Sequence, residues 1–137
     1  MNTKFHLAFK VKDIESTIQF YGKILGCKIG RSTANWIDFD FFGHQLSAHI
    51  SRDIPTIDYC GKVEKLKVPI PHFGCILESK EFNSVKKQLL KHQIEFLVEP
   101  QVRYKNKKGE QKTMFVFDYS NNAIEFKTFA NIEDVFN

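Results

Sequence analysis

Two histidines and one glutamate occupy matching places in similar stretches of this sequence. His6 and His72 each open a run in which apolar and polar residues alternate, and Glu125 lies within the last run of this kind. If the runs are β-strands, the alternation places all three side chains on the face opposite the apolar one. Two imidazoles and a carboxylate, with coordination positions left open, are a ligand set for a divalent metal that must also hold a substrate. The sequence therefore predicts one metal ion bound by His6, His72 and Glu125.

The elements that would position these ligands follow one order twice. Each module reads as strand, helix, strand, strand, strand, and Asp13 is suited to cap the first helix at its N-terminus. The first module (4–50) has its helix after Asp13 and its strands at 5–11, 27–29, 36–41 and 45–50. The second module (72–129) has its helix at 82–92 and its strands at 72–77, 94–98, 113–118 and 123–129. The repeat predicts an α+β fold built from a duplicated unit within one domain, 1–137.

Two stretches lack this periodicity. Residues 51–71 contain three prolines and a glycine, which is the composition of a linker between the modules. Residues 100–111 are polar and rich in lysine, and we expect them to form a long hairpin loop.

The bulk composition limits the partners. The chain is 42% hydrophobic with a net charge of +4, as in many globular proteins. A lysine cluster surrounds Gly109, but no aromatic–basic motif accompanies it, so we expect no nucleic-acid partner. No long apolar stretch predicts a membrane span or a secretory signal, so we expect no membrane partner and a cytoplasmic location. The three cysteines, Cys27, Cys60 and Cys75, match no zinc motif and are expected to be free thiols.

The chain resembles the vicinal oxygen chelate superfamily, which includes glyoxalase I, bleomycin-resistance proteins, fosfomycin-resistance enzymes and extradiol dioxygenases. The stretches that carry the resemblance are 6–14, 20–26, 72–74 and 117–126. It implies two tandem βαβββ modules that form a cupped mixed β-sheet half-barrel with the helices outside. The superfamily's first-strand histidine falls on His6, the opening histidine of its second module on His72, and its last-strand carboxylate on Glu125.

The fourth ligand position of the superfamily is where this sequence departs from it. Counting along the two modules places Ser47 opposite Glu125, and serine is a poor metal ligand. Members that resemble glyoxalase I carry a carboxylate there, so the departure counts against an isomerase of that type. His49, two residues on, could supply a fourth ligand or contact the substrate.

Several other side chains are candidates for contact with a chelated substrate. His49, Tyr104 and Tyr119 could act as an acid or base. Trp36 and Asp38 face the cleft by strand parity. Ser47 is a further candidate for substrate contact, and Arg103 could pair with a carboxylate or phosphate. For Tyr104 and Arg103, an ordinary loop-surface role is an equal alternative. His44 and His92 are expected at a turn and a helix end, outside the chemistry.

The resemblance implies a metal-dependent enzyme, dioxygenase-like or lyase-like, whose small oxygenated substrate chelates the metal through adjacent oxygens. Two histidines and a carboxylate favour Fe²⁺, with Mn²⁺, Zn²⁺ or Ni²⁺ as alternatives, and favour an extradiol dioxygenase over glyoxalase I. One alternative is a non-catalytic antibiotic-binding protein of the bleomycin-resistance type, and another is a metal-binding module without turnover. We expect a homodimer, and whether the cleft forms within one chain or across two stays open.

Overall fold

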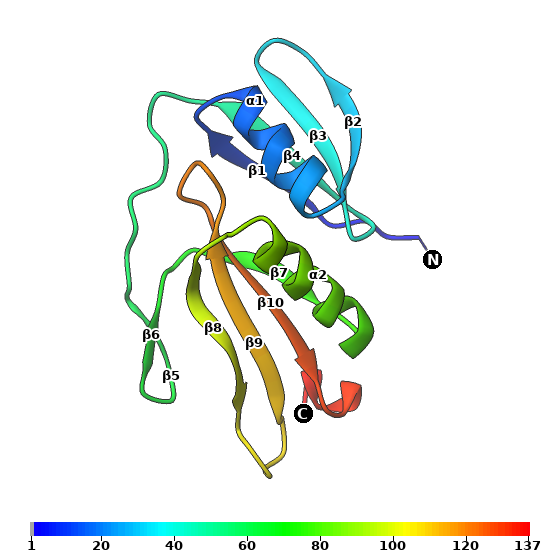
Figure 1. Ribbon diagram of the computed structural model, residues 1–137, viewed down its shortest axis with the longest axis vertical. Helices are drawn as coiled ribbons and strands as arrows, with labels where there is room; N and C mark the ends of the chain where they lie inside the picture. Colours follow the sequence, from blue (N-terminus) through cyan, green and yellow to red (C-terminus); the bar gives the residue numbers. More distant parts are fainter. Residues whose placement is uncertain (1) are drawn as a thin grey trace. The chain divides into compact units, whose positions relative to one another are not determined.

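The computed structural model describes residues 2–137 and divides into two compact units (Figure 1). Unit 1 consists of the chain up to Ile57 together with the segment Asp118–Asn122. Unit 2 consists of Asp58–Phe117 and Ala123–Asn137. Each unit contains one four-stranded mixed sheet, and the two sheets have the same topology.

Unit 1 follows the predicted order of elements. These are β1 (His6–Val11), α1 (Ile14–Thr17), the π-helix η1 (Ile18–Ile24), β2 (Lys28–Ser32), β3 (Trp36–Phe41) and β4 (His44–Ile50). The strands lie in the order β1-β4-β3-β2, with β1 parallel to β4. Asp13 caps α1 as predicted, because its carboxylate accepts a hydrogen bond from the Ser16 amide at 2.7 Å.

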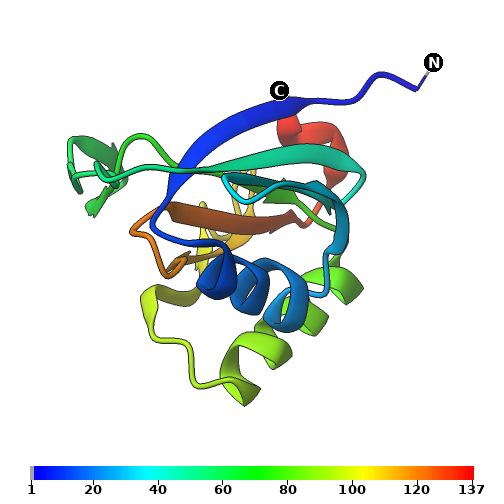
Figure 2. The ribbon, with the colours of Figure 1, turned by 90° about the horizontal axis from the view of Figure 1, so that it is seen from above.

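The core of unit 1 lies between η1 and one face of its sheet, an arrangement visible in Figure 2. Phe20, Tyr21 and Ile24 of η1 are fully or almost fully buried. The Tyr21 ring packs against Phe39 of β3, with 5.4 Å between the ring centroids. These three residues stand at helical spacing, so the helix turns one apolar face toward the sheet.

Unit 2 repeats the order and adds a small hairpin before it. Its elements are β5 (Gly61–Val63), β6 (Leu66–Val68), β7 (Phe73–Ile76), α2 (Ser79–Lys91), β8 (Phe96–Arg103), β9 (Gln111–Phe117), β10 (Ala123–Phe129) and the 3-10 helix η2 (Ile132–Val135). The strands of the main sheet lie in the order β7-β10-β9-β8, and β7 is parallel to β10. Helix α2 packs on β10 through its buried face, which carries Phe82, Val85 and Leu89.

Two predictions about irregular segments were wrong. The stretch 51–71 contains the β5–β6 hairpin, whose Val68 packs against Val98 and Phe115 of the main sheet. The expected loop from residue 100 is shorter, because β8 continues through Pro100 to Arg103. β8 is an edge strand with a register irregularity between Val98 and Gln101, and such a position tolerates a proline.

The parallel strand pairs align the two units residue by residue. Ala8 of β1 lies opposite Ser47 of β4, and Gly74 of β7 lies opposite Glu125 of β10. Ser47 therefore occupies in unit 1 the position that Glu125 occupies in unit 2, as counted from the sequence. A Cβ atom on Gly74 would overlap the backbone carbonyl of Glu125, so close strand approach requires glycine there.

The turn between β9 and β10 belongs to unit 1 by its contacts. Tyr21 is buried there and donates a hydrogen bond to Asp118 at 2.7 Å. Two further bonds join this turn to the end of β1: the Lys12 amide donates to Ser120 Oγ at 2.9 Å, and Asn122 Nδ2 donates to the Lys10 carbonyl at 2.8 Å. Burial is the main cause that raises the pKa of Asp118, and it also raises the pKa of Tyr21.

The cysteines are free thiols, as expected. Burial raises the pKa of Cys75 to about 12, so its thiol stays protonated and unreactive. None of the helices within residues 2–137 combines the length and apolar character needed to cross a lipid bilayer.

Candidate metal centre

Unit 2 brings two of the three predicted ligands together. His72 directly precedes β7, Glu125 lies on β10, and the parallel pairing of these strands places the two side chains side by side. His72 Nε2 lies 3.3 Å from Glu125 Oε1, and both side chains are mostly buried, with 22% and 14% of their areas exposed. The pair sits on the sheet face opposite α2, because Glu125 alternates with Ile124 and Phe126, which are buried in the core.

Each member of the pair is held by a second contact. His72 Nδ1 lies 2.7 Å from the Pro69 carbonyl, and because a carbonyl only accepts, Nδ1 carries the hydrogen. The imidazole ring also packs edge-on against Phe115, with 4.9 Å between the centroids. Thr113, which is fully buried, donates a short hydrogen bond to Glu125 Oε2. Such contacts to the outer atoms of a histidine and a carboxylate are the ones that orient metal ligands.

The hydrogen bond between the two side chains controls their protonation. It is the main cause that raises the pKa of His72. Burial alone would raise the pKa of Glu125, but the hydrogen bonds from His72 and Thr113 outweigh it, and the pKa is lowered. Because Nδ1 carries a hydrogen, the Nε2 atom of a neutral His72 presents only its lone pair to Glu125 Oε1. Two acceptor atoms this close require a cation between them, which is either a proton or a metal ion. The donor set therefore fits a divalent metal.

His6, the third predicted ligand, lies in unit 1 at the start of β1, where it is exposed and pairs with Gln45. Within residues 2–137, no three His, Cys, Asp or Glu side chains are gathered as a ready metal site. The structure thus assembles the pair of His72 and Glu125, and ligation by His6 stays a prediction.

The equivalent position in unit 1 is arranged differently. Ser47 is buried, and its hydroxyl donates to Asp38 Oδ1 at 2.6 Å. Asp38 lies directly across from Ser47 on the neighbouring strand β3, so unit 1 has its carboxylate one strand away from the expected place. This hydrogen bond helps to hold the Asp38 carboxylate in position, and it leaves the Ser47 hydroxyl without a free hydrogen.

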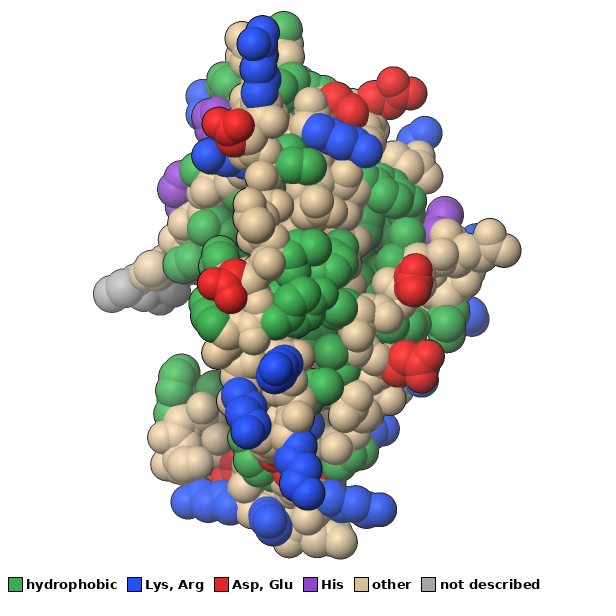
Figure 3. All heavy atoms as spheres, turned by 90° about the vertical axis from the view of Figure 1, so that its left-hand side faces the viewer, with side chains coloured by type: hydrophobic (Ala, Val, Ile, Leu, Met, Phe, Trp, Pro, Cys, Tyr) green, Lys and Arg blue, Asp and Glu red, His purple; other side chains and the backbone are tan. Residues whose placement is uncertain are grey.

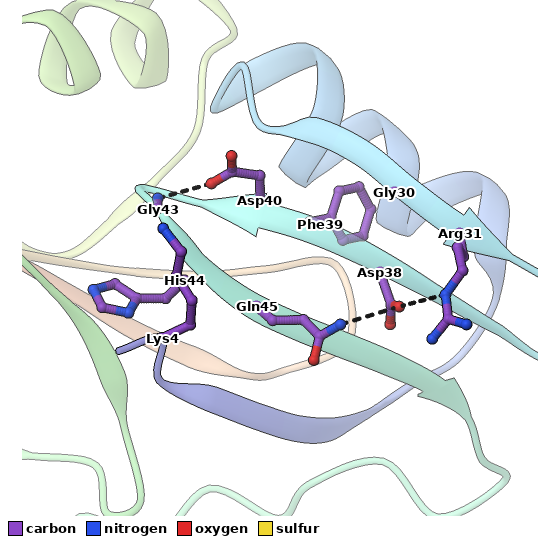
Figure 4. A pocket seen from close by; sticks show the side chains of 9 residues that line it. All are labelled: Lys4, Gly30, Arg31, Asp38, Phe39, Asp40, Gly43, His44 and Gln45. Carbon is purple, nitrogen blue, oxygen red and sulfur yellow. Dashed lines mark hydrogen bonds and ion pairs between the residues drawn. The ribbon is translucent and has the colours of Figure 1, made fainter. Parts of the chain in front are cut away.

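Asp38 also borders a hollow of about 340 Å³ in unit 1 (Figure 4). Gln45 Nε2 lies 3.4 Å from Asp38 Oδ2, and Arg31 Nε lies 4.0 Å from the same oxygen. His44, which also lines the hollow, accepts a hydrogen bond from the Phe5 amide at 2.9 Å. It was expected at the turn, and it is the first residue of β4 directly after it. Alternation on β3 placed Asp38 toward the cleft, but the sequence did not predict its contacts with Gln45 and Arg31.

His49 and Trp36, predicted to contact the substrate, lie next to each other across β4 and β3. His49 is exposed, and its ring lies 6.3 Å from the Trp36 ring at an interplanar angle of 33°. Arg31 covers the Trp36 ring at 5.8 Å. The three side chains form a surface cluster on unit 1, and a role in acid–base chemistry for His49 stays a prediction.

Tyr104 and Arg103 lie at the other end of the unit 2 sheet from the His72–Glu125 pair. Arg103 is level with Gln111 and Phe129, which is four residues beyond Glu125 on β10, or roughly 13 Å along the strand. The structure therefore does not bring Tyr104 to the pair. Arg103 is almost completely buried, so the alternative of a solvated loop residue is wrong for it.

Two other candidate residues lie outside the pair. Tyr119 is in the segment that belongs to unit 1, where its ring packs against Phe20 at 5.7 Å. His92 follows the last turn of α2 as its C-terminal cap, as expected.

Comparisons with known proteins place the fold. No protein-family model matches the chain. It is 30% identical to a crystal structure of a glyoxalase/bleomycin resistance protein/dioxygenase from Alicyclobacillus acidocaldarius, covering 98% of this chain and 97% of that one with a TM-score of 0.84. It is 28% identical to the metallothiol transferase FosB of Lysinibacillus sphaericus (strain C3-41), over 90% of this chain and 79% of that protein. The fosfomycin resistance protein FosX from Listeria monocytogenes shares the fold at 16% identity and a TM-score of 0.73, covering 98% of each chain. The predicted α+β fold is thereby confirmed.

Proposed function

The chain belongs to the glyoxalase/bleomycin resistance protein/dioxygenase family of the vicinal oxygen chelate superfamily, and on that basis we propose that it is a metal-dependent enzyme acting on a small oxygenated substrate. The observation that carries the proposal is the pair of His72 Nε2 and Glu125 Oε1, 3.3 Å apart, each held by an outer hydrogen bond. An Nδ1–H held by a backbone carbonyl, with Nε2 turned toward a carboxylate, is the outer contact typical of a metal-ligating histidine.

The proposed ligand set is His6, His72 and Glu125, which leaves coordination positions for two adjacent substrate oxygens. His6 enters the set because β1 and β7 occupy the same place in the two sheets. His6 lies two residues before the partner of Ser47, and His72 lies two residues before the partner of Glu125. When bound, the metal supplies a Lewis acid that neutralises charge on the substrate oxygens and a template that orients them. The protein's own part is to present one neutral imidazole nitrogen and one ionised carboxylate on a sheet face, with Thr113 keeping the carboxylate ionised.

For the reaction, we propose chemistry of the extradiol dioxygenase type with Fe²⁺ as the favoured metal, and Mn²⁺, Zn²⁺ or Ni²⁺ as alternatives. Ser47 supports a three-ligand face over the four-ligand set of glyoxalase I, since its hydroxyl is bonded to Asp38. Thiol transfer is the second candidate, favoured by the 28% identity to a metallothiol transferase. A non-catalytic binder of the bleomycin-resistance type is disfavoured, because His6, His72 and Glu125 are all present in this chain.

Metal analysis tests the ligand set. Protein purified without chelator should carry about one divalent ion per chain under the facial-ligand model. His72→Ala and Glu125→Gln should each abolish stoichiometric binding, and His6→Ala should do the same. His92→Ala is the matched control, because this histidine lies at a helix end of unit 2, and it should retain the metal. Full metal content in the His72 or Glu125 variant would refute the site.

Substrate screens then separate the reactions. An Fe²⁺-loaded extradiol enzyme should consume O₂ with a catechol, and a transferase should consume a thiol in the presence of fosfomycin without O₂. A binder should hold its ligand equally well in EDTA. Glyoxalase-type conversion of an α-keto-aldehyde with a thiol would overturn the argument from Ser47.

We also propose that the protein is a homodimer. Mass measurement in solution tests this directly. Mixing the metal-free His6→Ala and Glu125→Gln variants tests whether the ligands come from one chain or two. If a site draws on both copies, the mixture recovers metal binding at part of its sites. If each chain supplies a whole site, the mixture stays metal-free.

A further inference from the structure

A pocket of unit 2 lies between the β5–β6 hairpin and β8. It has a volume of about 570 Å³, and its lining residues are Val63, Glu64, Lys65, Leu66, Gln101 and Arg103. The hairpin is fixed to the main sheet by Val68, which packs on Val98 and Phe115. The pocket therefore has one rigid wall formed by the sheet and a second wall anchored to it.

Arg103 is buried in this pocket with most of its hydrogen-bonding capacity unused. Only 4% of the residue is exposed. Its Nη1 donates to the Val63 carbonyl at 3.3 Å, which ties the side chain to the hairpin. Its Nε and Nη2 are also buried, and within residues 2–137 neither has a hydrogen-bond partner. No carboxylate of residues 2–137 forms an ion pair with it.

The two unused nitrogens are the pair that binds oxyanions. The hydrogens on Nε and Nη2 point to the same side of the planar guanidinium, so they donate two parallel hydrogen bonds to one carboxylate or phosphoryl group. The guanidinium does not lose its charge at any physiological pH, so it cannot escape burial by becoming neutral. A buried charge without a partner is costly, and an anion bound at this fork would remove the cost.

We propose that this pocket is a binding subsite for an oxyanion, in which Arg103 holds a carboxylate or phosphoryl group by its Nε–Nη2 fork. Lys65 at the rim adds a positive charge, and Glu64 opposes it. Together Arg103, Lys65 and Glu64 give the pocket a net charge of about +1, which favours a single carboxylate or phosphoryl group over a polyanion. Figure 3 shows Lys and Arg side chains gathered in its lower part, the part of unit 2 that carries the β5–β6 hairpin and the β8–β9 connection, and they would attract such a ligand.

The subsite is separate from the His72–Glu125 pair. Arg103 is level with Phe129 on β10, four residues beyond Glu125, and on the edge strand two strands away. An oxyanion at Arg103 therefore needs no metal, and its binding can be measured when the metal pair is disabled.

The test is anion binding by the full chain in EDTA, with inorganic phosphate and acetate as probes and sodium chloride at equal ionic strength as the reference. Unfolding temperature should rise with phosphate, acetate or both, and the rise should saturate. Arg103→Lys keeps the charge but loses the fork, and should weaken the binding at least tenfold. Lys107→Met, which removes an exposed charge from the β8–β9 connection, should leave it within twofold. The stronger probe identifies the class of anion.

A second measurement does not depend on whether the variant folds. In ¹⁵N-labelled native protein, the side-chain Nε–H resonance of Arg103 should shift with the saturating probe and at the same midpoint. The proposal is overturned if neither probe acts beyond chloride, or if Arg103→Lys responds like the native protein. An unmoved Nε–H resonance during binding would also overturn it. Because EDTA is present, none of these outcomes depends on the proposed metal function.

Discussion

Thr113→Val tests whether the hydrogen bond to Glu125 prepares a metal ligand. Valine fills nearly the same volume, so the fully buried site keeps its packing, but Glu125 Oε2 loses its donor. A hydrogen bond to a charged group contributes about 1.5–3 kcal/mol. At about 1.4 kcal/mol per factor of ten, this corresponds to a metal affinity roughly 10- to 100-fold weaker. The same range is typical when an outer contact of a metal ligand is removed.

The assay is a chelator-competition titration of Zn²⁺ or Mn²⁺ at fixed pH. Thr128→Val is the matched control, because Thr128 is buried on the same strand as Glu125 but alternates to the opposite face. Its metal affinity should stay within about twofold of the native value. If Thr113→Val binds metal as tightly as the control while remaining folded, the carboxylate is not a ligand and the reasoning about the pair fails.

Three further results are expected from the same contacts. Gly74→Ala should unfold unit 2 or lower its denaturation midpoint sharply, because a Cβ atom there overlaps the backbone of Glu125. Gly22→Ala is the control and should be tolerated, because the atoms nearest to its Cβ lie at 3.7 Å or more. Tyr21→Phe removes a buried donor and should cost about 1–3 kcal/mol in urea denaturation, and an unchanged midpoint would show that the bond is not formed. The pKa of His72 is raised above its ordinary value of 6.5, and a metal ion binds only the neutral imidazole. Metal affinity should therefore fall by roughly tenfold per pH unit as the pH drops through that raised pKa. A flat profile in competition titrations from pH 6 to 9 would exclude His72 as a ligand.

The pH dependence of stability has the opposite sign in the metal-free protein. A raised folded pKa means that protonated His72 contributes stability fully below its ordinary pKa, and this contribution is lost as the pH rises through the raised value. Metal-free protein should therefore be more stable at pH 6 than at pH 9 through this pair, which guanidinium titrations at both values would measure.

Local patterns predicted much of the fold because each strand signal was contained within a few residues. The strands Trp36–Phe41 and Ala123–Phe129 have the predicted bounds. The register of the parallel pairs places Ser47 where the residue count placed it. Alternation also put His72 and Glu125 on a shared face, since a period of two residues determines the face of every strand residue.

The remaining features depend on contacts between distant residues. The β5–β6 hairpin has strands of three residues, too short for a periodic signal, and it is stabilised by packing on Val98 and Phe115 far along the chain. Pro100 suggested a loop because the sequence does not reveal that β8 is an edge strand. The burial of Arg103 follows from the hairpin that covers it, so no local pattern could show it.

The turn Asp118–Asn122 has a consequence for the synthesis of the protein. Residues up to Ile57 of unit 1 are synthesised first. The hydrogen-bond acceptor of Tyr21, Asp118, is synthesised only later, with the segment Asp118–Asn122. At 5–20 residues per second, that delay is roughly 3–13 s. During this interval the nascent first half exposes the end of β1, whose Lys10 carbonyl and Lys12 amide later bind the turn. A stop codon just before residue 118 would leave both units incomplete, because unit 1 would lack Asp118–Asn122 and unit 2 would lack β10.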